Sequence, residues 1–89
     1  MTADATEKIA KELEGFIRAS FQVPEDDEFF TRDVNLWEEG YVDSIGIVET
    51  MGFIEQTWQV RLPEEVVFDP RFTHIDGMAV VIQERLPAA

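Results

Sequence analysis

The chain has 89 residues, 45% of them hydrophobic, with 19 acidic against 7 basic side chains, no cysteine and a formal charge of −12 at pH 7. A chain of this length buries only about 60–65% of its unfolded surface, so we expect one domain over residues 1–89 without the deep cleft of an enzyme. Because cysteine is missing, disulfides and thiolate metal sites are excluded. The strongly negative charge makes nucleic acid and membranes poor partners. The lack of an apolar run of about 18 residues favours a soluble, cytoplasmic protein.

Residues 4–20 are predicted to form an amphipathic helix. Four apolar side chains recur there at helical spacing along one stripe: Ile9, Leu13, Phe16 and Ile17. Asp4 stands three residues before Glu7, as in a capping box with an acidic N-cap, and this pair would mark the start of the helix. Pro24 prevents easy continuation beyond its end.

Residues 21–43 show no hydrophobic period and are predicted to form a long loop. A loop of this length should be held down by its own side chains, and three aromatic residues are the expected anchors: Phe29, Phe30 and Trp37. Residues 36–39 should form a short turn before Gly40. The acidic residues of the loop lack the glycine and terminal glutamate of a calcium-binding loop at the required spacing, so we expect solvated charges and no metal site.

A second helix is predicted over residues 44–58. Four of its side chains should face the core: Ile47, Met51, Ile54 and Trp58. Residues 64–68 should add one or two helical turns, with Pro63 at the first helical position and Pro70 beyond the end. A short strand is the alternative for this segment.

The last helix is predicted to begin at Thr73, whose hydroxyl would cap the first turn while Asp76 lies at the third helical position. Its inner face should consist of five apolar residues: Ile75, Met78, Ala79, Ile82 and Leu86. Pro87 should end it. Four helical segments of unequal length around one apolar core predict an all-α four-helix bundle with a long first loop and a short third helix.

Asp43 and Ser44 mark the start of the second helix. If Asp43 is the N-cap, its carboxylate accepts an amide of the first turn and leaves the Ser44 hydroxyl free of capping duty. The unpaired first-turn amides and the helix dipole favour negative charge, so a phosphodiester on Ser44 would lie in a favourable field. Taken alone, the Asp-Ser pair favours an ordinary helix start over a modification site.

The outer face of the same helix carries an apolar patch beside Ser44. Helical geometry places five residues together there: Ile45, Val48, Glu49, Gly52 and Gln56. Such a patch, rimmed by acidic side chains that include Glu38, Glu39 and Glu55, predicts a transient contact with a partner protein that has a basic surface. Gly52 would either flatten this surface or allow close packing against a neighbouring element.

Residues 36–46 resemble the attachment region of the acyl carrier protein family, with the sequence Leu-Trp-Glu-Glu-Gly-Tyr-Val-Asp-Ser-Ile-Gly. The likeness continues at Val48-Glu49, at Ile54-Glu55, at Trp58 and at residues 62–65 and 72–75, and it extends from the first helix to Leu86. The resemblance implies that Ser44, beside Asp43, receives 4′-phosphopantetheine from coenzyme A through a phosphopantetheinyl transferase. The thiol of that arm would hold an acyl or aminoacyl group as a thioester.

The resemblance also implies a non-catalytic carrier, monomeric when free, that docks on partner enzymes. The implied partners are the phosphopantetheinyl transferase, a loading ligase or acyltransferase, and a downstream transferase or synthase. The expected docking residues lie along the second helix: Ile45, Val48, Glu49, Gly52 and Glu55. Departures from the family pattern at Gly46, Gly52 and Trp58 weaken an assignment to primary fatty-acid synthesis and favour polyketide or nonribosomal peptide pathways.

Three other functions compete with the carrier role. An enzyme would need Ser44 as nucleophile and His74, the one histidine, as base, but no Gly-x-Ser-x-Gly elbow surrounds the serine. An acidic protein–protein interaction module without a prosthetic group would fit the charge and gives Ser44 no role. A carrier of primary fatty-acid synthesis is the third. Nothing in the sequence indicates a pocket for cargo or names the cargo.

Overall fold

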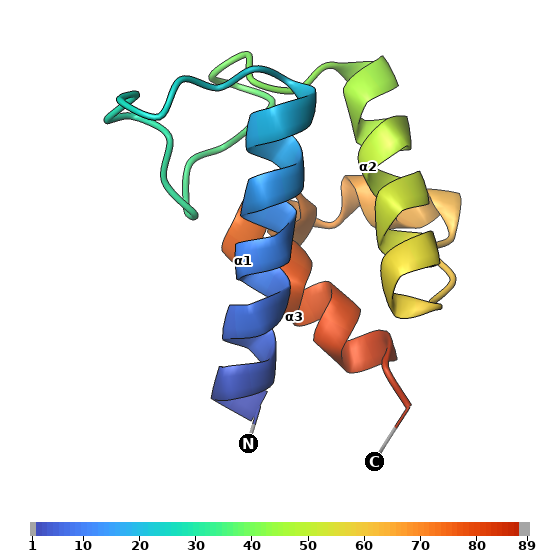
Figure 1. Ribbon diagram of the computed structural model, residues 1–89. Coiled ribbons are helices and arrows are strands. Elements are labelled where there is room, and N and C mark those ends of the chain that lie inside the picture. Colours follow the sequence, from blue (N-terminus) through green and yellow to red (C-terminus); the bar gives the residue numbers. More distant parts are fainter. Residues whose placement is uncertain (1, 88–89) are drawn as a thin grey trace.

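The computed structural model describes residues 2–87, with side chains from residue 5 onward, and this part of the chain is helical and contains no strand (Figure 1). Three α-helices and two short 3-10 helices follow one another: α1 (Thr2–Ser20), α2 (Ser44–Trp58), η1 (Glu64–Phe68), η2 (Pro70–Thr73) and α3 (Ile75–Arg85). The predicted all-α class is therefore confirmed.

The predicted count of four helices is not confirmed, because the short third helix is replaced by η1 and η2. Pro63 caps η1 instead of forming its first position, and the Asp69 carboxylate caps η2 by accepting the Arg71 amide at 2.9 Å. Pro70 has no N–H to continue a hydrogen-bonded helix from η1, so the chain makes two separate tight turns there.

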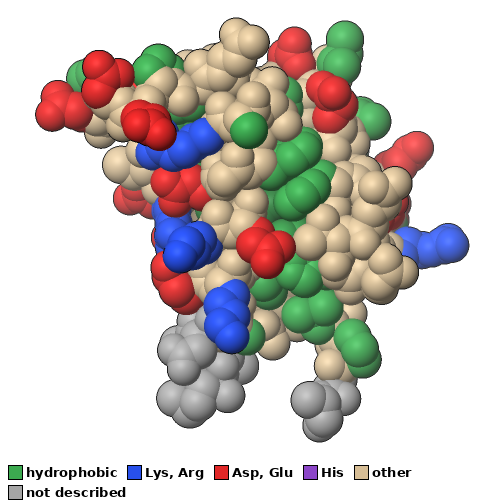
Figure 2. All heavy atoms as spheres, viewed as in Figure 1, with side chains coloured by type: hydrophobic (Ala, Val, Ile, Leu, Met, Phe, Trp, Pro, Cys, Tyr) green, Lys and Arg blue, Asp and Glu red, His purple; other side chains and the backbone are tan. Residues whose placement is uncertain are grey.

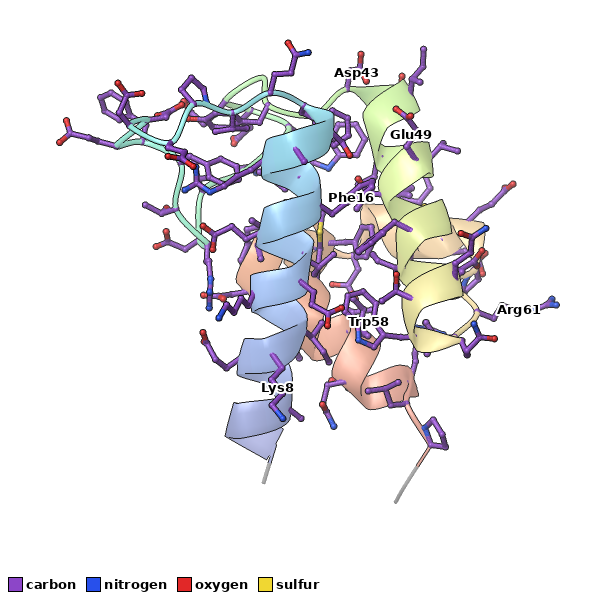
Figure 3. The ribbon with its side chains drawn as sticks, in the orientation of Figure 1. Lys8, Phe16, Asp43, Glu49, Trp58 and Arg61 are labelled. Atoms are coloured by element: carbon purple, nitrogen blue, oxygen red, sulfur yellow. The ribbon has the colours of Figure 1, made fainter. Side chains whose placement is uncertain are left out.

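The core lies mainly between α1 and α3, which pack against each other, while α2 stands beside them (Figure 1). The largest fully buried side chains come from all parts of the fold: Leu13, Ile17, Leu36, Ile54, Phe72, Ile75, Met78 and Ile82. Phe16 of α1 is only half-buried and stacks on Phe53 of α2, with ring centroids 4.2 Å apart, in the space between the two helices (Figure 3). This aromatic pair joins α2 to the rest of the molecule.

The predicted core stripe of α2 is confirmed at Ile47 and Ile54, which are buried, whereas Met51 and Trp58 are half-buried. Sequence periodicity did not indicate Thr50, which is fully buried. Its hydroxyl donates to the carbonyl oxygen of Gly46 at 2.9 Å, so the buried polar atom is satisfied within the helix.

Two predicted helix starts are wrong. Asp4 lies inside α1, which begins at Thr2, so Asp4 is not its N-cap. Thr73 belongs to η2, and its hydroxyl donates to Pro70; the N-cap of α3 is His74, without a side-chain cap bond. The backbone carbonyl of Arg32 in the long loop accepts the Asp76 amide at 2.9 Å and takes the place of a side-chain cap.

The long loop between α1 and α2 extends on the side of α1 away from α2 before it returns to the start of α2 (Figure 1). The expected anchor Phe30 is buried and Trp37 is half-buried, but Phe29 is 80% exposed, so its predicted anchoring role is wrong. Leu36 anchors the loop in its place, because its side chain is fully buried and its amide donates to the carbonyl oxygen of Thr73 at 2.8 Å.

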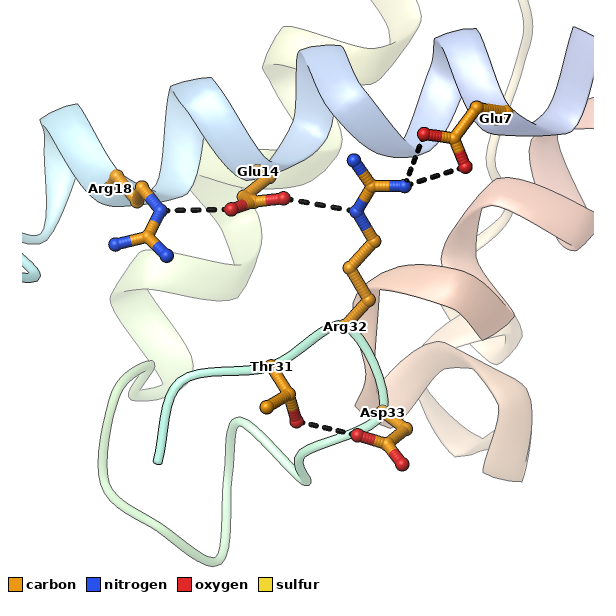
Figure 4. A network of polar contacts seen from close by, with 6 residues as sticks. All are labelled: Glu7, Glu14, Arg18, Thr31, Arg32 and Asp33. Carbon is orange, nitrogen blue, oxygen red and sulfur yellow. Dashed lines mark hydrogen bonds and ion pairs between the residues drawn. The ribbon is translucent and has the colours of Figure 1, made fainter. Parts of the chain in front are cut away.

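Arg32 fastens the loop to α1. Its guanidinium pairs with Glu7 at 2.7 Å and with Glu14 at 3.0 Å, and Glu14 also pairs with Arg18 at 3.0 Å (Figure 4). Burial opposes the charge of Glu14, but hydrogen bonds from Arg32 and Arg18 outweigh it and hold the pKa of this carboxyl below its usual value. The guanidinium of Arg18 lies 4.6 Å from the centre of the Phe30 ring, so one short network fixes several points of the loop.

Candidate functional site

The N-cap of α2 is Asp43, as predicted. Its backbone is extended, with φ −104° and ψ −174°, and its carboxylate accepts the Gly46 amide at 2.7 Å. This bond satisfies one of the amides that every helix start leaves without an intrahelical partner.

A tight turn before α2 delivers Asp43 to the surface. The carbonyl of the buried Leu36 accepts both the Tyr41 amide at 3.0 Å and the Val42 amide at 3.1 Å. Gly40, at φ +78°, adopts the left-handed conformation that the reversal requires and that glycine tolerates best. Val42 is buried, so the two residues that follow it emerge at the rim of the fold.

Ser44 is the first residue of α2 and its side chain is exposed. Among residues 2–87, no side chain or backbone group is hydrogen-bonded to its hydroxyl. The first turn of α2 carries no acidic residue, and the capping Asp43 directly precedes it, so the partial positive charge of the helix start is only partly offset there. The geometry therefore leaves the Ser44 oxygen accessible in a field that favours an attached anion.

The outer face of α2 exposes two large apolar side chains close to Ser44: Ile45 is 72% exposed and Val48 is 66% exposed. Glu49 and Gly52 are exposed on the same helix, and Figure 3 shows Glu49 on the half of α2 that begins at Asp43. A Cβ atom built on Gly52 would meet nothing within 4 Å, which excludes close packing as the reason for this glycine.

Glu55 differs from the other expected docking residues. It is half-buried, and its carboxylate accepts the backbone amide of Leu62 at 2.8 Å. The sequence pattern placed it on the rim of the apolar patch, whereas the structure gives it an internal partner.

An open groove of about 610 Å³ runs beside Ser44, and no sequence pattern indicated it. One wall is formed by α2, including Ser44, Val48 and Met51, and the other by residues 62–68, including Val67 and Phe68. Phe68 is 84% exposed. Hydropathy patterns find faces of single helices, and this groove lies between two segments, so periodicity could not reveal it. The α1 side of the molecule is different in character, since Figure 2 shows charged side chains gathered over α1 and the loop.

The geometry offers no support for catalysis by Ser44 and His74. The Nδ1 atom of His74 lies 3.2 Å from the Thr73 hydroxyl, and no contact between His74 and Ser44 is found in the described part of the chain. Within the same residues, no three histidine or acidic side chains are grouped to hold a metal ion, and no helix has the length and apolarity to cross a membrane.

An all-helical chain with a capping aspartate and an exposed serine at the head of its middle helix has the architecture expected of a carrier protein. No protein-family model matches the sequence. Two curated proteins do: the anthracycline acyl carrier proteins DpsG of Streptomyces peucetius and DauA of Streptomyces sp. (strain C5) are each 35% identical to this chain over 78 residues, which cover 88% of this chain and 90% of theirs. The chain belongs to the acyl carrier protein family.

Proposed function

We propose that this protein carries acyl groups in polyketide biosynthesis on a 4′-phosphopantetheine arm attached to Ser44. The observation that supports the attachment site is the division of roles at the start of α2, where Asp43 caps the helix and the exposed Ser44 hydroxyl has no hydrogen bond within residues 2–87. The pathway rests on the relatives, since both are named as carriers for anthracyclines.

The residues present fit a phosphopantetheine group. When bound, this group supplies a terminal thiol that holds an acyl group as a thioester. Ser44 would contribute the oxygen of the phosphodiester, and the first turn of α2 would stabilise its negative charge. The groove between α2 and residues 62–68 gives the site an apolar neighbour, so the protein supplies attachment and surroundings, and catalysis belongs to its partners.

We propose that the outer face of α2 docks these partners in the cytoplasm. Ile45 and Val48 offer apolar contact area, and Glu49 adds a negative charge beside them. A formal charge of −12 accelerates encounter with basic surfaces while a small contact keeps exchange fast. The partners of this surface would be a phosphopantetheinyl transferase, an acyltransferase or loading ligase, and a downstream synthase.

Mass spectrometry tests the attachment site. The protein is incubated with coenzyme A and a broad-specificity phosphopantetheinyl transferase, alongside Ser44→Ala and Ser20→Ala, which removes the other serine of the chain. We expect one phosphopantetheine adduct on the wild-type protein and on Ser20→Ala, and none on Ser44→Ala. An adduct on Ser44→Ala would refute the site, and no adduct on any of them would favour the acidic interaction module.

Loading trials test the cargo. The modified protein is offered malonyl, long-chain fatty acyl and aminoacyl donors with their loading enzymes, and the acylated fraction is measured by mass. A carrier for polyketides should accept malonyl groups. Preference for aminoacyl donors would move the assignment to nonribosomal peptides, and preference for fatty acyl donors would move it to fatty-acid synthesis.

A further inference from the structure

Glu55 bridges the two walls of the groove beside Ser44. It lies near the end of α2, and its carboxylate accepts the backbone amide of Leu62, seven residues further along the chain, at 2.8 Å. Glu55 and Leu62 both line the groove, one from each wall. The bond therefore connects the Ser44 wall directly to the opposite one.

The Leu62 amide needs this partner. Gln59 ends α2 in the left-handed conformation, with φ 56° and ψ 43°, and the chain turns back so that the Leu62 side chain enters the core. No backbone carbonyl accepts the Leu62 amide within residues 2–87. An amide withdrawn from water without a partner is costly, so removing the carboxylate would release this segment.

The next residue makes the position of this bond important. Pro63 has no N–H to donate, and the Val66 amide bonds locally to the Pro63 carbonyl within the turn of η1. Among the described residues, the bond to the Glu55 carboxylate is thus the last hydrogen bond to α2 before Val67 and Phe68, which complete the second wall of the groove. Its hydrogen bond sets where that wall begins relative to Ser44.

We propose that Glu55 is a positioning residue that holds residues 62–68 against α2 and so fixes the groove in which a group attached to Ser44 would lie. The inference rests on the proposed carrier function and assigns Glu55 an internal role in place of the docking role its sequence position indicates. The two roles depend on different properties of the side chain. Positioning needs a hydrogen-bond acceptor, whereas electrostatic docking needs a negative charge.

Two substitutions separate these properties. Glu55→Gln keeps an acceptor oxygen and loses the charge, and Glu55→Ala loses both. Glu64→Gln is the matched control, because Glu64 also lines the groove, is exposed, and has no side-chain hydrogen bond or ion pair within the described residues. Circular dichroism establishes that each variant is folded before the comparison.

Hydrogen exchange of the Leu62 amide, followed by NMR in the unmodified protein, is the first readout. We expect exchange at least about tenfold faster in Glu55→Ala and within about threefold of wild type in Glu55→Gln and Glu64→Gln. Unchanged exchange in Glu55→Ala would overturn the proposal. So would equal acceleration in Glu55→Gln, since an acceptor would then not suffice.

Hydrolysis of a thioester loaded on the modified protein is the second readout. Glu55→Ala should lose its cargo several-fold faster than wild type, with Glu55→Gln restored to the wild-type rate. Equal hydrolysis in all variants would refute the positioning of the groove even if Leu62 exchange had changed. Should the wild-type protein accept no arm, the proposed function fails, and the exchange comparison still decides whether Glu55 holds residues 62–68 in place.

Discussion

The carboxylate of Asp43 accepts the amide of Gly46 at 2.7 Å, and Ser44, the first residue of α2, lies exposed beside this bond. Serine is itself a good N-cap, so the pair could have exchanged roles. Because the aspartate takes the amide, the serine hydroxyl is available for modification.

Asp43→Ala should lower the free energy of unfolding by about 1 kcal/mol, the usual cost of losing an N-cap side chain. Asp43→Asn should stay within a few tenths of a kcal/mol of wild type, because its amide oxygen accepts the same bond. Urea unfolding monitored by circular dichroism measures both. An equal loss in the two variants would show that the charge of Asp43, and not the cap bond, provides the stability.

Two glycines of α2 should respond to alanine with opposite signs. Gly52→Ala should raise the free energy of unfolding by up to about 1 kcal/mol, because alanine favours the helix and the added Cβ meets nothing within 4 Å. Gly46→Ala should lower it by about 1–3 kcal/mol, because its Cβ would lie 2.8 Å from Cε1 of Phe21. Thermal unfolding of both variants tests the pair. A neutral Gly46→Ala would mean that the Phe21 ring moves aside without cost.

Val48→Asp should slow transfer of the arm by the phosphopantetheinyl transferase several-fold. It should not unfold the protein, because Val48 is exposed and outside the core. Val80→Asp, at an exposed valine of α3, is the matched control and should leave the rate unchanged. Charge reversal at Glu49 should also slow transfer, and reversal at the exposed Glu12 of α1 should not. Equal effects of the paired changes would point to overall charge and not to a docking face.

A helix start can be predicted from the sequence when the residues that cap it are neighbours in the chain. The start of α2 depends on the neighbouring residues 43–46, so Asp43 could be recognised as the cap from the sequence. The start of α3 depends on the carbonyl of Arg32, which comes from a distant loop, and the sequence wrongly favoured Thr73.

Side-chain direction limited the predictions in the loop. Phe29 and Phe30 are adjacent and equally apolar, but only Phe30 is buried, beneath Arg18 and against Tyr41 at a centroid distance of 5.0 Å. A loop without periodic backbone gives no rule for which neighbour turns inward. The internal partner of Glu55 could not be predicted for a different reason, because Leu62 lies beyond the helix whose periodicity defines the pattern.

Glu14 should make stability depend on pH through its pairs with Arg32 and Arg18. Hydrogen bonds from the two arginines outweigh burial and lower the pKa of Glu14 below its usual 4.5. The stabilisation is therefore complete at pH values above 4.5 and is lost as the pH falls through the lowered pKa of the folded state. At pH 7, Glu14→Gln should be less stable than wild type by about 1 kcal/mol, a figure kept small because the pairs are partly exposed.

Urea unfolding of wild type and Glu14→Gln from pH 7 to pH 3 measures this difference. The gap between them should narrow below pH 4.5, because protonation then removes from the wild type the charge that the variant lacks. Glu12→Gln removes the same charge from an exposed position of α1 and corrects for relief of repulsion in a protein with a formal charge of −12. A gap that stays constant over this range would mean that the ionisation of Glu14 does not contribute to the stability of the fold.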